Sequence, residues 1–207
     1  MSEEELVNTG TDKYLVPAKA RMKDVGAVCT HTMLTGGSFC VRDAEAPELR
    51  LAIAQDSLAE RVPSISELRT PKFPMYLDLD FRLPRATLAP ETVERIAFVC
   101  TTTLQRLYPN ADEAFRCLVC TKVRGATADG DDAWKHGVHL HWPKVILDVE
   151  KALHVRLNIV HELLRTSWGD ELGLPSPPWD DIVDEAVFTN PAGGLRMLFA
   201  PKARKCV

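Results

Sequence analysis

The segment FPMYLDLDFRL, residues 73–83, places two aspartates inside a run that otherwise reads as a buried strand. Side chains alternate between the two faces of a strand, so Asp78 and Asp80 share one face and the apolar residues around them share the other. Two neighbouring carboxylates repel each other, and partial burial adds to the cost of ionising both. A bound divalent cation removes that cost, and Mg²⁺ or Mn²⁺ prefers carboxylate oxygens. The alternative is an exposed strand edge whose acids are solvated.

The composition is that of an ordinary globular protein. The chain has 207 residues, enough for one domain or for a core with a smaller module, with 45% apolar and 26% charged residues. Its formal charge of −4 gives no overall attraction to nucleic acid, so any such contact needs local basic patches. The acidic start, MSEEELVNTG, has no apolar core of a signal peptide, and no apolar run reaches membrane-span length. We therefore expect a soluble intracellular protein.

Six cysteines also indicate a reducing compartment, because several lie inside apolar runs such as FRCLVCTKV. Cys117 and Cys120 form a single C-x-x-C pair, without a second pair or a histidine at zinc-finger spacing. This spacing favours free core thiols over a zinc site.

The first 70 residues predict an N-terminal α/β module. GAVCTHTML and GSFCVRD, on either side of a Gly-Gly turn, predict a hairpin, and APELRLAIAQDSLAERV predicts a helix that ends before Pro63. We expect this module, residues 1–70, to pack on a main module of residues 71–207.

The main module has the predicted order β-α-β-β-α-β. Strands are predicted at residues 74–81, 113–123 and 136–147, with helices at 89–108 and 149–168, followed by a strand IVDEAVF at 182–188 and a further strand GLRMLFA. In the second helix, Leu153, Leu157, Val160 and Leu164 predict the buried face. This order is that of the split βαβ sheet of ferredoxin-like and RRM-like folds, so we expect an α+β protein with one open sheet face.

Other strands add polar side chains that would lie beside the two aspartates. In KHGVHLHW, Gly137, His139 and His141 share one face, and Asp184 lies inside IVDEAVF. Arg196 and the basic stretch PKARK follow. Carboxylates that hold two metal ions, with cations that hold a triphosphate, are the groups that nucleotidyl transfer requires.

The order of YLDLDF, GVHLHW and VDEAVF, followed by GLRMLFAPK, resembles the three motifs of the archaeo-eukaryotic primase (AEP) superfamily. These motifs are an acid-x-acid strand, a small-x-His strand and a hydrophobic-acid strand. The likeness is greatest to PrimPol-type enzymes and to the primase domains of primase-helicases from large DNA viruses. It covers about residues 70–205 and is weaker before them.

The resemblance implies a role for each matching residue. Asp78, Asp80 and Asp184 would be catalytic and would hold two Mg²⁺ or Mn²⁺ ions. The nucleotide would be bound by residues at the family's small, histidine and basic positions, which are Lys135, Gly137, His139, Arg196 and Lys202. His141 faces the same way as His139 and is the alternative phosphate contact. The implied partners are NTP or dNTP and a single-stranded DNA template, in the nucleus, the cytoplasm or a viral replication site.

The sequence departs from the family beyond the third motif. Relatives carry a zinc-binding Cys/His segment there that assists primer initiation, whereas this sequence stops at ARKCV. We therefore expect zinc only in a missing C-terminal segment, and a catalytic core truncated from a longer protein with a helicase portion. Two other functions stay open, namely a metal-dependent nuclease that uses the same acids and a non-catalytic RRM-like module that binds nucleic acid.

Overall fold

The computed structural model describes residues 10–33, 36–59, 65–84, 87–109, 115–126, 134–190 and 194–196. Helices and strands are interspersed along the chain, which places the protein in the α+β class, as expected. The chain divides into two compact units. The first unit consists of Met1–Thr70 together with Ala192–Val207, and the second unit consists of Pro71–Pro191.

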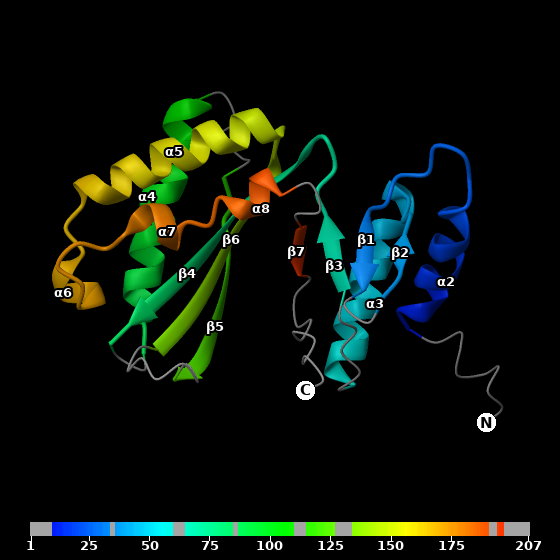
Figure 1. Cartoon of the computed structure of the whole chain (residues 1–207), viewed down its shortest axis with the longest axis horizontal. Coiled ribbons are helices and arrows are strands. Elements are labelled where there is room, and N and C mark those ends of the chain that lie inside the picture. The colour runs from blue at the N-terminus through cyan, green and yellow to red at the C-terminus, as the bar shows by residue number, and fades with distance from the viewer. Residues whose placement is uncertain are drawn as a thin grey trace. The chain divides into compact units, whose positions relative to one another are not determined.

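The unit of residues 71–191 is built on a three-stranded antiparallel sheet (Figure 1). Its strands are β4 (Phe73–Leu83), β5 (Leu118–Ala126) and β6 (Trp134–Leu147), in the order β4-β6-β5. Because β6 is antiparallel to both neighbours, β4 and β5 run parallel with β6 between them. This is the predicted split βαβ arrangement.

Two amphipathic helices, one after β4 and one after β6, pack against each other on the same side of the sheet (Figure 1). Helix α4 (Pro90–Leu107) starts with a proline, whose missing N–H costs nothing in a first turn. Helix α5 (Val149–Arg165) is capped by Asp148, whose side chain accepts the Lys151 N–H at 2.9 Å. Both helices were predicted from the sequence.

The core lies between these helices and the sheet. Every second residue of β4 and β6 points into it and is buried, and burial of each such side chain contributes roughly 1.5–3 kcal/mol. They include Met75, Leu77, Leu79, Phe81, Leu83, Val138, Leu140 and Trp142. The alternation leaves the remaining side chains of both strands for the opposite face, the open face of the sheet.

The prediction of a strand at residues 182–188 is wrong. Helices α7 (Trp179–Ile182) and α8 (Ala186–Thr189) occupy most of it, and a single antiparallel bridge joins Val183 to Leu79. The side chain of Asp184 accepts the Ala186 N–H at 2.8 Å, and such local bonds favour a helix start over a strand. The bridge nevertheless lies beside β4, where the fourth strand of a split βαβ sheet would run.

Tryptophans fix α7 on the core. Trp179 packs edge-on against Trp168 with 5.5 Å between ring centroids, and against Phe81 of β4 with 6.1 Å. Trp168 also donates its indole N–H to the Leu163 carbonyl oxygen at 2.9 Å. Between these tryptophans lies the short helix α6 (Gly169–Leu172). The chain after α5 is therefore held back against β4.

The other unit contains a four-stranded sheet in the order β2-β1-β3-β7. The strands are β1 (His31–Met33), β2 (Ser38–Phe39), β3 (Ile65–Leu68) and β7 (Gly194–Arg196), with helices α2 (Asp12–Arg21) and α3 (Ala46–Leu58) and the 3₁₀ turn η1 (Asp43–Glu45). The predicted hairpin is present as β1 and β2. A small core unites the helices and strands, formed by Leu15, Ala18, Phe39, Val41, Leu49, Ile53 and Ile65.

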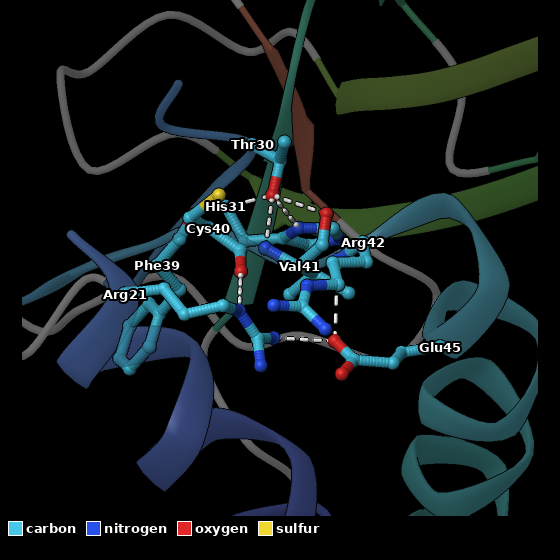
Figure 2. Close-up of polar contacts among 8 residues, drawn as sticks. All are labelled: Arg21, Thr30, His31, Phe39, Cys40, Val41, Arg42 and Glu45. Atoms are coloured by element: carbon cyan, nitrogen blue, oxygen red, sulfur yellow. Dashed lines mark hydrogen bonds and ion pairs between the residues drawn. The ribbon is translucent and has the colours of Figure 1, made fainter. Parts of the chain in front are cut away.

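A polar network ties α2 and η1 to the hairpin (Figure 2). Arg21 of α2 donates its Nε–H to the Cys40 carbonyl oxygen at 2.9 Å and pairs with Glu45. The Thr30 hydroxyl accepts the Val41 N–H at 2.8 Å and contacts the imidazole of His31. These bonds connect elements that the short strands alone would hold weakly.

The expected module of residues 71–207 needs one correction at its C-terminal end. Strand β7 pairs antiparallel with β3, with Arg196 opposite Ser66, and so belongs to the sheet of the first unit and not to that of β4. The partner of a strand can lie far away in the sequence, and three residues do not indicate which strand they pair with. Among the described helices, none is long and apolar enough to cross a membrane.

Candidate active site

The open face carries a cross-strand arrangement of charged and polar side chains. Asp78 of β4 lies opposite His139 of β6, and Asp80 lies opposite Gly137. The side chains of Asp78 and Asp80 keep 22% and 38% of their surface exposed, while Leu79 between them is fully buried. The alternation read from the sequence therefore holds, and both aspartates lie at the surface of a rigid sheet.

Each of the two carboxylates has a basic partner from β6. Lys135 Nζ lies 2.6 Å from Asp80 Oδ2, and His139 Nε2 lies 3.2 Å from Asp78 Oδ1. These four side chains come from two adjacent strands paired residue for residue, so their backbones are held by the ladder. The repulsion between the two acids is thus offset by the Lys135 ammonium and by a hydrogen-bonding imidazole, which reach them from the next strand.

The structure separates the two histidines of GVHLHW. His139 contacts Asp78, whereas His141 lies opposite Tyr76, with 6.2 Å between the ring centroids. The His139 and His141 rings are 6.2 Å apart. His139 is therefore the imidazole beside the acidic pair.

Gly137 leaves open surface next to Asp80. A Cβ built there would lie 3.8 Å from Asp80 Oδ1 and 3.9 Å from the Lys122 carbonyl oxygen, which is ordinary contact. The fold itself therefore does not demand glycine at this position. Lys122 of β5, opposite Gly137, is exposed and adds a cation to the open face that the sequence analysis did not single out.

Asp184 approaches the pair through its backbone. Its N–H donates to the Asp78 carbonyl oxygen at 2.9 Å, next to the bridge between Val183 and Leu79. Its carboxylate accepts the Ala186 N–H at 2.8 Å. Over the described residues, no three His, Cys, Asp or Glu side chains converge closely enough to hold a metal ion. The structure thus brings Asp184 beside Asp78 in the chain fold, without a closed three-carboxylate cage.

Arg156 of α5 is the residue near this site that the sequence analysis missed. Its side chain is only 6% exposed, and it contacts the segment of residues 180–185 that contains Asp184. The predicted buried face of α5 excluded it, yet Leu157 and Leu164 of that face are more than half exposed. A charged residue with apolar neighbours three and four positions away was the signal available in the sequence.

Two of the predicted nucleotide-binding residues are not placed at this site. Arg196 lies in β7, and its side chain is outside the described part of the chain. Lys202 lies outside the described residues altogether. Their roles stay predictions from the resemblance.

The C-x-x-C cysteines behave as thiols. Burial raises the pKa of Cys117 to about 11 and also raises the pKa of Cys120. Both are therefore protonated near neutral pH when no metal ion is bound. Both cysteines are partly buried and form no disulfide.

A cavity of about 330 Å³ lies elsewhere, at the C-terminal end of α5. It is lined by residues 164–169, 175–177 and Trp179, and none of the acidic residues of the open face reaches it. The acids instead occupy a sheet surface that a ligand would approach from solvent.

A family model for the C962R protein N-terminal AEP domain matches residues 30–205 of the 207 residues. The chain belongs to this family. The resemblance to the AEP superfamily, and to the primase domains of viral primase-helicases, is therefore confirmed. The match includes the open face of the sheet and most of the first unit, where the sequence motifs were weak.

The comparison with curated proteins gave no match. An AEP domain implies primase-type nucleotidyl transfer, with nucleotides and single-stranded DNA as binding partners.

Proposed function

We propose that this AEP domain is the catalytic core of a primase-polymerase that adds NTPs or dNTPs to a 3′-hydroxyl on a single-stranded DNA template. The observation that carries this proposal is the pairing of Asp78 and Asp80 with His139 and Lys135 across two adjacent strands. Carboxylates can bind metal ions, and the basic side chains next to them can bind phosphates. A nucleoside triphosphate that binds together with metal ions needs both kinds of group on one surface.

The carboxylates fit Mg²⁺ or Mn²⁺, because the donors are oxygens on an exposed face. Asp78 and Asp80 would hold the metal ions, with Asp184 as the third carboxylate beside Asp78. Bound divalent ions stabilise the attacking and leaving oxygens of an in-line displacement. The residues of the protein supply the positions of these groups on the sheet.

The basic side chains would bind the triphosphate. Lys135 and His139 now contact the acids, and a phosphate offers each of them an alternative charged acceptor. Gly137 would leave room for the phosphates beside Asp80, and Lys122 extends the cationic surface across β5. Arg196 and Lys202 would add basic groups by the resemblance alone.

The arrangement argues against a non-catalytic RRM-like module. Such modules stack bases on exposed aromatic rings of the open sheet face. Here strand β4 presents acids at Asp78 and Asp80, and Tyr76 is buried at 7% exposure. This composition favours metal and phosphate binding over base stacking.

The test is incorporation of labelled NTPs and dNTPs on primed and unprimed single-stranded DNA with Mg²⁺ or Mn²⁺. We expect template-dependent extension of the primed strand. Degradation of the DNA without incorporation would show a nuclease that uses the same acids and would contradict the proposal. Addition of EDTA provides the control for metal dependence, and the unprimed template separates de novo priming from extension.

A further inference from the structure

Arg156 presents a buried guanidinium to the segment that contains Asp184. It lies on the inner face of α5 with 5% of its surface exposed, among Ala152, Val155, Ile159 and Val160, which are buried too. Helices α7 and α8, on either side of Asp184, both contact α5 (Figure 1). A buried arginine is costly unless its donors are satisfied, so its partners show what it does.

Two of the partners are backbone carbonyls. Arg156 Nε donates to the Val183 carbonyl oxygen at 2.9 Å, and one terminal nitrogen donates to the Asp180 carbonyl oxygen at 2.7 Å. The planar fork of a guanidinium can hold two such acceptors at once in fixed directions. The side chain therefore fixes the path of the backbone from residue 180 to residue 183.

The ion pairs of Arg156 are the weaker contacts. Its other terminal nitrogen lies 3.4 Å from an Asp180 carboxylate oxygen and 3.3 Å from one of Glu185. These two acidic side chains are 72% and 53% exposed, so solvent screens their attraction. The buried carbonyl bonds, and not the ion pairs, position the segment.

The Val183 carbonyl and the Asp184 N–H belong to one peptide group. In a trans peptide the two point in opposite directions. Arg156 binds the oxygen of this group, and the Asp78 carbonyl accepts its N–H at 2.9 Å. A single peptide plane is thus clamped between α5 and β4. Its orientation sets where the Cα of Asp184 lies relative to Asp78.

We propose that Arg156 is a positioning residue, which orients the peptide group between Val183 and Asp184 and so keeps Asp184 beside Asp78. The role of Asp184 as a metal ligand rests on the proposed function. The clamp itself is a property of the fold and can be measured without any catalysis.

The test compares Arg156→Lys with wild type. Lysine keeps the charge but has no fork, so it cannot hold both carbonyls in the same directions. Hydrogen exchange followed by NMR should be at least 10-fold faster at the Asp184 amide, while the Leu172 amide, bonded to Trp168, keeps its rate. Arg165→Lys, on the exposed side of the same helix, is the matched control and should leave both amides unchanged.

A second pair of variants separates the carbonyl bonds from the ion pairs. Asp180→Asn and Glu185→Gln remove the charges and keep the backbone acceptors, so the Asp184 amide should stay protected. Unchanged exchange at Asp184 in Arg156→Lys, or equal acceleration at Leu172, would overturn the proposal. If Arg156→Lys does not fold, Arg156→Gln, which retains a donor, is measured against the same two amides.

Mn²⁺ titration shows whether the clamp matters for the metal site. We expect the half-saturating Mn²⁺ concentration to rise about 10-fold in Arg156→Lys, with the nucleotide KM nearly unchanged. If wild type bound no Mn²⁺ and incorporated no nucleotide, the proposed function would fail. The exchange rate of the Asp184 amide would still decide whether Arg156 positions that residue.

Discussion

The N–H of Asp184 donates to the carbonyl oxygen of Asp78 at 2.9 Å, although 106 positions separate the two residues in the sequence. Asp78 lies on the 11-residue strand β4, and Asp184 lies between two four-residue helices. This backbone bond brings Asp184, the third predicted metal ligand, to the strand that carries the first two, while its carboxylate accepts the Ala186 N–H. It is the contact from which the proposed site is assembled.

His139 should matter more for nucleotide binding than His141. His139 contacts Asp78, whereas His141 packs near Tyr76. Loss of one charge-assisted hydrogen bond to a phosphate costs about 1.5–3 kcal/mol, so we expect His139→Ala to raise the nucleotide KM by roughly 10-fold or more. His141→Ala is the matched comparison. A larger increase with His141→Ala would assign the phosphate contact to the other imidazole.

Lys135 should bind the substrate and should not contribute much to stability. In Lys135→Ala, Asp80 loses its partner at 2.6 Å but remains partly exposed to water. We expect a KM increase of roughly 10-fold for the nucleotide and a change in unfolding free energy within about 1 kcal/mol. Lys144→Ala, at an exposed position further along β6, is the control. Equal KM effects in both variants would indicate only a general loss of positive charge.

Gly137→Ser should fold normally. The new Cβ would meet Asp80 Oδ1 at 3.8 Å and no backbone strain arises, so we expect a change in unfolding free energy within about 1 kcal/mol. Primer extension should remain, because serine also satisfies the small position of the small-x-His motif. Thermal unfolding and extension rates measure the two effects. Unfolding of the variant would show that this part of β6 is packed more tightly than the distances imply.

The first unit should lose stability as the pH falls below about 6.5. Burial lowers the pKa of His31 from its ordinary value of 6.5, opposed by Glu67 and assisted by Arg50. The unfolded chain therefore binds a proton that the folded chain does not, and stability rises with pH between the folded and unfolded pKa values. The stabilisation is fully present above pH 6.5 and is lost toward the lower folded pKa.

Hydrogen exchange at the Leu68 amide, which donates to the Thr30 carbonyl at 2.7 Å, measures this effect in the first unit. All four tryptophans lie between residues 134 and 179, so their fluorescence monitors the second unit separately. His31→Gln should flatten the dependence, whereas the exposed His154→Gln should leave it. A dependence that persists in His31→Gln would assign it to another group.

Most of the fold of residues 71–191 could be predicted from local patterns in the sequence. The strand of Asp78, the two long helices and the antiparallel strand of His139 follow from alternation, from helical periodicity and from Pro90 at a helix start. The face shared by Asp78 and Asp80 also follows, because alternation in a strand is strict. Long elements with one buried face carry this signal over many residues.

The remaining features depend on contacts that no short window contains. Residues 182–188 look like a strand, but the Asp184 side chain starts a helix and leaves one bridge at Val183. Strand β7 was assigned to the wrong sheet because its partner, β3, lies far away in the sequence. Arg156 was missed because four apolar residues predicted another face of α5, and two of these are exposed.

The most direct test of the account is the rate of metal-dependent primer extension by Asp78→Ala. Asp181→Asn, at an exposed acid in α7, is the control for loss of one negative charge. Loss of several kcal/mol of charge stabilisation predicts that Asp78→Ala falls by about 100-fold or more at every Mg²⁺ or Mn²⁺ concentration, while Asp181→Asn stays near wild type. Metal-dependent synthesis that survived Asp78→Ala unchanged would contradict a metal site on the open face.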